Sequence, residues 1–434
     1  MHSDKESDLQ ETDGSVDKTE GQSKKLPFLI RRNFALQWSG QTISVFGSHI
    51  TGMGLELTAN LTLRANASQM GLLAALGSAP VLLVGLFAGV WVDRVRRRPV
   101  MIASDLARAL LLVTVPVAAV LGLLHIEQLY VVTVLVGMLT VFYQVANQSF
   151  LPTLVRREEI VEANGKLSAS SSLAEIGGPT LGGVLVQMLT APFAILFDVA
   201  SFLVSALCTS LIRVREPAPV PQAEGESAWK EMREGLRLLS GNSLLRAVTV
   251  SSAIRNFSGS AFAALYGLYV IRVLDVTPAL FGVLVTAGGA GALLGAFATG
   301  RIVRHFGTGR VLIGAMLLAA VLSLLTPLAT GPDIIVYAML FTGQLIGDFG
   351  LAIYLINEVS LLQVLVPDQS LGKASASMRF LIEGMIPIGA ILAGMLGTIW
   401  GMRLTLLAGC MGFCLSALWL VFSPLRTWHE GEAN

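Results

Sequence analysis

The feature that most constrains this chain is a series of long apolar segments, which begins after Asn33 and continues almost to the C-terminus. A helix needs about 20 apolar residues to cross the hydrocarbon core of a bilayer. Of the 434 residues, 53% are hydrophobic and only 14% are charged, whereas an average soluble domain has roughly 25% charged residues. We therefore expect an all-α integral membrane protein. Its twelve predicted transmembrane helices are 34–58, 69–92, 99–122, 128–150, 164–189, 192–212, 246–270, 278–300, 310–330, 333–356, 370–397 and 402–423.

The distribution of Lys and Arg predicts how these helices are oriented. With the N-terminus inside, the inner loops and helix ends hold seventeen basic residues, and the outer side holds only Arg64, Arg272 and Arg403. Basic residues are enriched in cytoplasmic loops. We therefore expect a multi-pass protein of the cell (inner or plasma) membrane, with both termini cytoplasmic.

Composition also divides the chain along its length. The first 23 residues are acidic and almost free of apolar side chains, which is typical of a disordered tail. The one long internal polar segment contains an amphipathic stretch from Trp229 to Leu239, which favours a helix on the cytoplasmic membrane surface. The predicted parts are a disordered cytoplasmic tail, a six-helix bundle, a cytoplasmic linker with this amphipathic helix, a second six-helix bundle and a cytoplasmic tail, at 1–32, 33–212, 213–243, 244–425 and 426–434.

The two predicted bundles repeat one another weakly. The segment 89–93 followed by 99–102 matches 300–304 followed by 310–313, and Glu175 to Pro179 resembles Glu383 to Pro387. Six spans repeated in the same orientation are found in alternating-access carriers, where the substrate site lies between the repeats. We therefore expect two pseudo-symmetric six-helix bundles around a central cavity.

The loop between the second and third spans carries a candidate conformational latch. A carboxylate here can accept hydrogen bonds from the N-terminus of a neighbouring helix, and arginines can pair with acidic groups of the other bundle. The simpler interpretation is a basic loop that only fixes the topology. The residues of this candidate latch are Gly89, Asp93, Arg94, Arg97 and Arg98.

The fifth span carries a pattern of small residues around a proline. Glycines allow close helix contact, and a proline bends a span. We expect these residues to pack against Gly288, Gly289, Ala290, Gly291 and Gly295 of the eighth span and to seal the outer leak path. Generic small-residue packing is the alternative. The pattern consists of Gly165, Ala174, Gly178, Pro179, Gly182 and Gly183.

Together these two segments resemble the major facilitator superfamily. The loop is similar to the family's Gly-x-x-x-Asp-Arg-x-Gly-Arg-Arg motif, with Arg96 in place of a glycine, and the fifth span resembles its antiporter motif, with Ala174 in place of a glycine. Three further segments, 33–47, 104–108 and 198–202, resemble the drug-exporting branch that includes macrolide efflux proteins and enterobactin-type siderophore exporters. This resemblance implies proton-driven export of bulky, amphipathic molecules such as antibiotics, secondary metabolites or siderophores.

Charged side chains inside the spans are expensive and therefore mark candidate functional groups. Asp105 and Arg108, three residues apart in the third span, are expected to form a structural ion pair. Structural pairing of a carboxylate with Arg255 is the alternative to proton transfer. The proton-coupling candidates are Glu175 and Asp348, followed by Glu383 and Asp198, although Glu383 also has Arg379 four residues away.

Several other functions receive less support from the sequence. A proton-coupled importer of a small metabolite with the same fold is the first alternative, and a transport-inactive membrane sensor or a membrane enzyme is the second. We expect no cofactor, no metal, no enzymatic activity and no nucleic-acid partner, because 30 basic residues balance 29 acidic ones and no metal or nucleophile cluster is visible. The expected partners are protons, a small-molecule substrate and the lipid bilayer, with the chain acting as a monomer.

Overall fold

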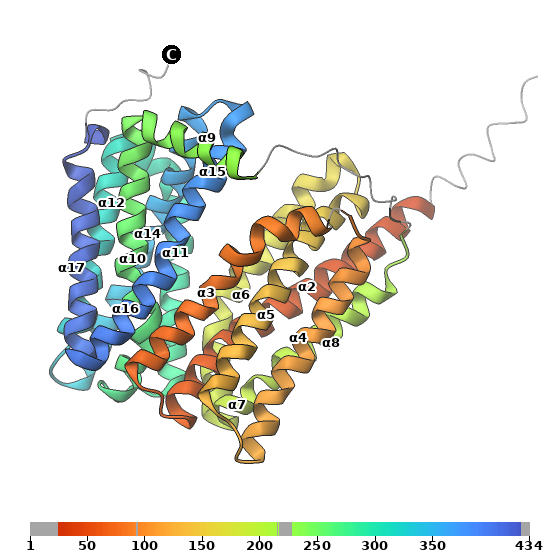
Figure 1. Cartoon of the computed structure of the whole chain (residues 1–434), viewed down its shortest axis with the longest axis horizontal. Helices are drawn as coiled ribbons and strands as arrows, with labels where there is room; N and C mark the ends of the chain where they lie inside the picture. The colour runs from red at the N-terminus through yellow and green to blue at the C-terminus, as the bar shows by residue number, and fades with distance from the viewer. Residues whose placement is uncertain (1–24, 93, 215, 217–227, 427–434) are drawn as a thin grey trace, which may run out of the picture.

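The computed structural model describes residues 25–92, 94–214, 216 and 228–426, and these residues contain helices but no β-strand (Figure 1). The helices of the first half, here called the N-half, are α2 Lys25–Leu57, η1 Thr58–Thr62, α3 Ala67–Val92, α4 Arg97–Val120, α5 Ile126–Phe150, η2 Leu151–Thr153, η3 Arg157–Glu159, α6 Ile160–Leu189, α7 Ala191–Ala194 and α8 Leu196–Leu211. Those of the second half, the C-half, are α9 Ala228–Gly241, α10 Ser243–Arg272, α11 Pro278–Phe306, α12 Thr308–Ser323, α13 Leu325–Leu328, α14 Asp333–Leu365, α15 Asp368–Glu383, α16 Met385–Ile399, α17 Met402–Val421 and η4 Pro424–Arg426.

The two halves form two groups of long helices that meet at one end of the molecule and diverge towards the other (Figure 1). The main contacts between the halves join α6 to α11, and α3 to α16 and α10. We call the end where the halves meet the α7 end, and the end that carries α9 the α9 end. The grouping of the long helices therefore follows the division at the linker.

Nine helical segments in the described part of the chain are long and apolar enough to cross a membrane. The other three predicted spans correspond to α2, α6 and α10, which have 33, 30 and 30 residues. These helices are long enough, but they carry many polar side chains, such as Gln37 and Gln41 in α2 and Ser252 and Arg255 in α10. The count of twelve spans thus remains a prediction at these three helices.

Two predicted spans are broken by proline. Pro327 and Pro387 have no backbone N–H, so the carbonyls four residues earlier lose their usual helical donor. The helix breaks at Leu324, between α12 and α13, and at Gly384, between α15 and α16. At the first break, the Sγ of Cys410 lies 3.3 Å from the freed carbonyl oxygen of Ser323 and donates to it. A neighbouring helix thus satisfies the backbone group, as membrane proteins require.

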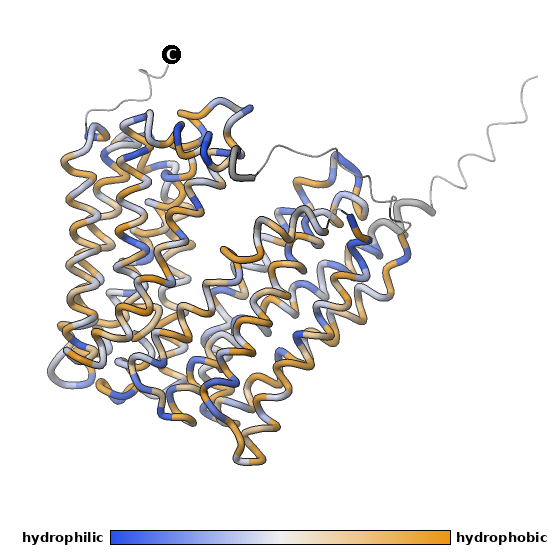
Figure 2. The backbone as a smooth tube through the Cα atoms, in the orientation of Figure 1, coloured by the Kyte–Doolittle hydropathy of each residue, from blue (hydrophilic) through white to orange (hydrophobic). Residues whose placement is uncertain are grey.

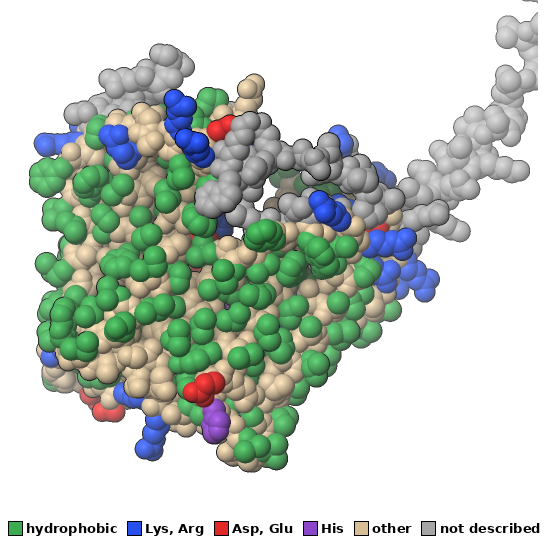
Figure 3. All heavy atoms as spheres, in the orientation of Figure 1, with side chains coloured by type: hydrophobic (Ala, Val, Ile, Leu, Met, Phe, Trp, Pro, Cys, Tyr) green, Lys and Arg blue, Asp and Glu red, His purple; other side chains and the backbone are tan. Residues whose placement is uncertain are grey.

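The polarity of the molecule is inverted relative to a soluble protein. Large side chains such as Phe87 and Phe297 are each 73% exposed, whereas Asp105 is fully buried. Apolar residues run along the middle of the helices, and polar residues concentrate near their ends (Figure 2). On the face shown in Figure 3, hydrophobic side chains cover the middle, and the charged ones lie towards the two ends. Such a surface requires a hydrocarbon environment around it.

The predicted amphipathic helix of the linker is present as α9, and it packs on α15 and α10. A Cβ added at Gly235 would lie 2.3 Å from the carbonyl oxygen of Lys373, so only glycine allows this approach. Lys373 Nζ lies 2.7 Å from a carboxylate oxygen of Glu234, and Ser377 Oγ donates to the carbonyl of Met232. The helix is therefore fixed to the C-half, and its position on the membrane surface stays a prediction.

Candidate transport site

The first seam between the halves joins α6 to α11 at the α7 end. A Cβ at Gly183 would lie 2.3 Å from the carbonyl oxygen of Pro278, and one at Gly282 would lie 2.4 Å from that of Pro179. Next to these two contacts, the hydroxyls of Thr180 and Thr286 are 2.6 Å apart. Backbones approach this closely only when one of the facing residues has no side chain.

The residues of the predicted fifth-span motif divide between two neighbours. Gly178 packs on His49 and Gly182 on Ile50, both in α2, whereas Gly183 faces α11. Ala174 is fully buried, and Gly165, nearer the α9 end, has open space where a Cβ would be. The motif thus serves packing within the N-half as well as the seam between the halves.

The expected partner glycines in α11 are only partly correct. Gly289 does face α6, where a Cβ would lie 3.2 Å from the side chain of Ile176. Gly288, Gly291 and Gly295 instead face α14, and a Cβ at Gly291 would lie 1.9 Å from the carbonyl oxygen of Leu345. The prediction fails for these three because α11 is sandwiched between α6 and α14, and glycines on its second face serve the second neighbour.

Two further contacts close the α7 end, and the sequence analysis predicted neither. One is a second seam, between α3 and α16; the other, here called the clasp, is the set of hydrogen bonds from Arg272 to the N-half. Gly71 in α3 meets Gly394 in α16 so closely that a Cβ at Gly71 would lie 2.6 Å from the Cα of Gly394. The guanidinium of Arg272 donates to the carbonyls of Ala65, at 2.9 Å, and Asn60. In the sequence, these contacts were visible only as the glycines Gly71 and Gly394 in two predicted spans and as Arg272, one of the three basic residues assigned to the outer side.

At the α9 end the halves separate, and cavities lie between them. One cavity of about 770 Å³ has Ser78 and Val81 of α3 on one wall and α10, α14 and α15 on the others. A second cavity, of about 310 Å³, lies within the C-half and shares Arg255 and Asn256 with the first. A hollow between the halves is visible in the upper middle of Figure 3. The larger cavity is therefore accessible from the α9 end, because the seams close the other end of the space between the halves.

The two leading carboxylates lie on either side of α11. Asp348 in α14 lines the smaller cavity and contacts Gly288, where a Cβ would lie 2.1 Å from a carboxylate oxygen. Glu175 in α6 is exposed, and its backbone carbonyl lies beside Gly289. The two side chains interact electrostatically. The fold thus brings a carboxylate of each half to the same helix at the boundary between the halves.

Arg255 does not pair with either of the two leading carboxylates. It makes no ion pair within 4 Å with Glu175 or Asp348 in the described residues. Its electrostatic partner is Glu358, which is only 6% exposed, and its guanidinium carbon lies 5.8 Å from the ring centroid of Tyr354. The half-buried cation thus interacts with a carboxylate that the sequence analysis had not selected, one turn beyond Tyr354. Within the part of the chain that the structure describes, no Lys or Arg forms an ion pair with Asp348.

The two lesser candidates already have partners. Glu383 forms an ion pair with Arg379, whose guanidinium nitrogens lie 3.0 Å from its carboxylate, at the wall of the larger cavity. Asp198 is buried in the N-half and accepts a hydrogen bond of 2.7 Å from Ser201. Both carboxylates are tied by near neighbours on their own helices, which favours structural roles.

Asp105 and Arg108 form an ion pair inside the N-half. Their side chains are 0% and 3% exposed. The guanidinium carbon of Arg108 also lies 4.6 Å from the ring centroid of Tyr143 and 4.1 Å from that of Phe202. Arg108 therefore stands between an anion and two aromatic faces, which is an arrangement that compensates a buried cation.

The candidate latch is only partly within the described residues. Asp93 lies outside them, whereas Gly89 falls in the last turns of α3 and Arg94 is two residues beyond its last residue, Val92. Arg98 donates to the carbonyls of Thr209, at 3.0 Å, and Ser210, both at the end of α8. This arginine therefore contacts its own half here, and not the partner bundle.

The N-terminus of α4 is capped by the carboxylate of Glu216, which follows α8 and is more than 100 residues away along the chain. Glu216 accepts hydrogen bonds from the backbone N–H groups of Arg97, at 2.7 Å, and Arg98, at 3.0 Å. The first N–H groups of a helix have no intrahelical partner, and the helix dipole favours a negative charge there. Sequence reasoning missed this residue, although an acidic side chain just after the last span of the N-half was visible.

Comparison with known proteins identifies the family. Residues 24–434 match the family described as transmembrane secretion effectors. The chain belongs to the major facilitator superfamily. The match extends over almost the entire sequence, so it includes both halves, and it confirms the resemblance drawn from the loop and the fifth span.

Related transporters of this superfamily come from several bacteria. The multidrug efflux pump Tap of Mycolicibacterium fortuitum is 27% identical over 393 residues, which are 86% of this chain and 92% of Tap. Macrolide efflux protein A of Streptococcus pyogenes is 24% identical over 261 residues, 59% of this chain and 63% of that protein. This chain thus matches less than two thirds of the length of macrolide efflux protein A.

Solved structures of the superfamily share the fold at low sequence identity. A point mutant of the nucleoside transporter NupG is 12% identical with a TM-score of 0.74, covering 91% of this chain and 99% of NupG. A bacterial homologue of the iron transporter ferroportin, solved in an inward-facing state, is 16% identical with a TM-score of 0.73, covering 90% and 98%. At such identities, the likeness establishes the fold alone.

Proposed function

We propose that this major facilitator protein is a proton-coupled exporter of bulky amphipathic small molecules, such as antibiotics, secondary metabolites or siderophores. It exchanges substrate for protons by alternating access, as a monomer in the cell membrane. Twelve spans in two six-helix bundles, 33–212 and 244–425, make up the transporter, and both termini are cytoplasmic. The names of the efflux relatives support export over import.

The observation that carries this proposal is the cavity of about 770 Å³ between the halves, open at the α9 end and closed at the α7 end by two seams and a clasp. Its apolar wall and its Arg379–Glu383 pair suit an amphipathic substrate. Because the α9 end carries the linker and most basic residues, it faces the cytoplasm in this proposal. Substrate enters there, and opening of the seams releases it outside.

Asp348 and Glu175 are the proposed proton-coupling pair. Asp348 lines the smaller cavity, and Arg255, the nearest cation in that cavity's lining, is compensated by Glu358. Each member of the pair belongs to one half and rests against α11, so rocking of the halves changes how closely they approach each other. A change in the distance between like charges changes their proton affinity, which is the coupling that an antiporter needs.

The loop after α3 provides the proposed latch of the alternate state. In the present arrangement, Arg98 is held by the end of α8, and Glu216 caps α4. When the halves close at the α9 end, Asp93, Arg94 and Arg97 can engage the opposite bundle while Gly89 allows the close approach. The latch then stabilises the outward-open state.

The test is uptake of a fluorescent amphipathic drug into inside-out vesicles under an imposed proton gradient. The variants are Glu175→Gln, Asp348→Asn and Asp93→Asn, with the exposed Glu127→Gln as the matched control. We expect uptake by the wild type and the control, loss of gradient-driven uptake in Asp348→Asn or Glu175→Gln, and slower turnover in Asp93→Asn.

The possible contrary results are distinct. Uptake that survives collapse of the gradient would contradict proton coupling. Transport only in right-side-out vesicles would establish import instead. Full activity of both carboxyl variants would remove Asp348 and Glu175 from the coupling mechanism.

A further inference from the structure

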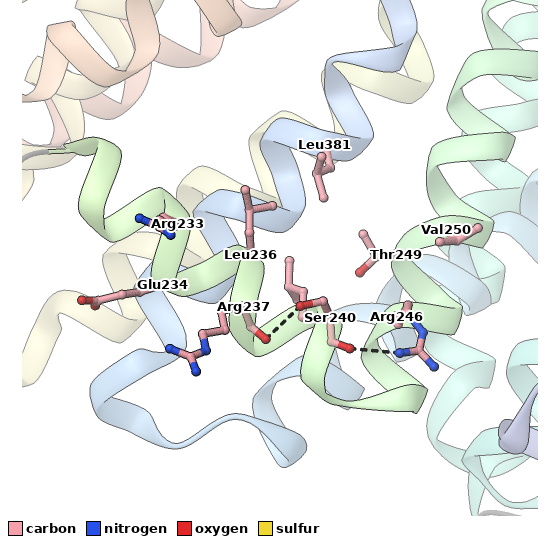
Figure 4. A pocket seen from close by; sticks show the side chains of 10 residues that line it. Arg233, Glu234, Leu236, Arg237, Ser240, Arg246, Thr249, Val250 and Leu381 are labelled. Atoms are coloured by element: carbon pink, nitrogen blue, oxygen red, sulfur yellow. Dashed lines mark hydrogen bonds between the residues drawn. The ribbon is translucent and has the colours of Figure 1, made fainter.

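A separate pocket lies at the α9 end of the C-half, away from the cavities between the halves. It has a volume of about 830 Å³ and is bounded by α9, α10 and α15. Figure 4 shows its side chains from these three helices around a common space. The lining consists of Arg233, Glu234, Leu236, Arg237, Leu239, Ser240, Arg246, Thr249, Val250 and Leu381.

The charge around this pocket is positive. Arg233, Arg237 and Arg246 are all exposed. Arg246 donates to the carbonyl of Ser240 at 3.0 Å, whereas the guanidinium groups of Arg233 and Arg237 make no hydrogen bond or ion pair with the described residues. The one acid in the lining, Glu234, is compensated by Lys373 at 2.7 Å. The lining therefore carries three guanidinium groups, on two sides of the pocket (Figure 4), and a single carboxylate that is already compensated.

The opposite side of the pocket is apolar. Leu236 and Leu239 of α9, Val250 of α10 and Leu381 of α15 supply it, and Leu239 is 3% exposed. The pocket is also firmly built, because Gly235 fixes α9 against α15. An arrangement of a charged rim over an apolar wall is complementary to a ligand with an anionic head and a hydrocarbon tail.

The position along the helices specifies the ligand further. α10 begins at Ser243, just before Arg246, where the predicted transmembrane span 246–270 starts. The arginines therefore lie where the helices leave the bilayer, at the level of lipid headgroups. Guanidinium groups bind phosphate oxygens in a bidentate manner, and basic pockets at the ends of transmembrane helices hold anionic headgroups.

We propose that this pocket binds the phosphate headgroup of an anionic phospholipid, with its acyl chains against Leu236, Val250 and Leu381. The lipid fills the space between the linker helix and the C-half and joins α9 to α10. This site depends on the membrane location of the chain but not on the transported substrate or on proton coupling.

Native mass spectrometry of the protein released from nanodiscs tests this site. The nanodiscs contain phosphatidylcholine with or without phosphatidylglycerol. We expect the wild type to retain phosphatidylglycerol selectively. The variant with Arg233→Gln, Arg237→Gln and Arg246→Gln should bind it about 100-fold more weakly, since each of the three basic residues near the membrane surface contributes about fivefold. The matched control replaces Arg301, Arg304 and Arg310, three exposed arginines of the same half.

Every other outcome overturns the proposal. Equal retention of phosphatidylglycerol by the wild type and the pocket variant excludes the site, as does an equal loss in the control. Stabilisation of the wild type by inorganic phosphate to the same extent as by phosphatidylglycerol assigns the pocket to a free anion. An unchanged elution profile and melting temperature in phosphatidylcholine alone establish that the pocket variant is folded.

Discussion

At the scale of single residues, the close contact of the two halves at the α7 end depends on glycines. Gly183, Gly282 and Gly71 each place backbone of one half directly against backbone of the other. An added methyl group there has no space, and overpacking typically costs about 1–3 kcal/mol. Glycines at the seams therefore determine how closely the halves approach each other.

Gly282→Ala is expected to loosen the α6–α11 seam, because its Cβ would lie 2.4 Å from the carbonyl oxygen of Pro179. The measurement is labelling of a cysteine placed at Thr180 by an impermeant maleimide, in a chain without its own three cysteines. We expect several-fold faster labelling. Gly300→Ala, on the same helix but in open space, is the control and should leave the rate unchanged. Equal rates in all three chains would show that the seam tolerates the methyl group.

Arg108→Met is expected to destabilise the protein by about 3 kcal/mol, because it leaves the buried Asp105 without its cation. Thermal unfolding in detergent provides the measurement. Lys166→Met removes an ion pair with Glu162 whose side chains are 50% and 70% exposed, and it should cost about 0.5 kcal/mol or less. Replacing both Asp105 and Arg108 by apolar residues should recover part of the loss. A loss as small as that of Lys166→Met would contradict the pairing.

At the scale of elements, Glu216 ties the end of α8 to the start of α4. Glu216→Ala removes two hydrogen bonds and a favourable interaction with the helix dipole, which should cost about 1 kcal/mol. We expect about fivefold faster hydrogen exchange at the amides of Arg97 and Arg98. Glu127→Ala, in the first turn of α5, where no side chain caps the helix, should have no such effect. Unchanged exchange in Glu216→Ala would mean that water replaces the cap.

The elements also show how far sequence reasoning reaches. Nine of the twelve spans, and the helix α9, were predictable, because periodicity and apolar length are local properties. The seam through Gly183 and Gly289 was predictable as well, because its glycines follow a spaced pattern within one helix. The meeting of Gly71 with Gly394 and of Glu216 with Arg97 was not, because these partners lie far apart along the chain and no local pattern links them. For the same reason, the pairing of Arg255 with Glu358 required the packed structure.

At the scale of the whole molecule, the proposed alternation between two openings is expected to depend on the hydrogen bonds of Arg272 across the halves. Arg272→Met removes its hydrogen bonds to Ala65 and Asn60, so the α7 end should open more readily and the α9 end should close. Spin labels at the exposed positions 161 and 306, at the α9 ends of α6 and α11, should report a shift to shorter distances.

Arg403→Met is the matched control for the clasp, since Arg403 donates to Pro327 within the C-half at 2.8 Å. It should leave the distance distribution unchanged. An identical distribution in Arg272→Met and the wild type would contradict the role of the clasp.

Because the seams lie near one end of the helices, a small rotation at the seams produces a larger displacement at the other end. The glycine contacts of α6 with the C-half lie from residue 175 onwards, so the first 15 residues of this helix form an arm of roughly 22 Å that belongs to the N-half. With the seam as fulcrum, a rotation of roughly 10° moves the tip of this arm by about 4 Å. Displacements of a fraction of an ångström among the glycines are thus amplified into the width of an entrance. Substitutions far from any bound molecule can therefore change which sizes of molecule the transporter admits.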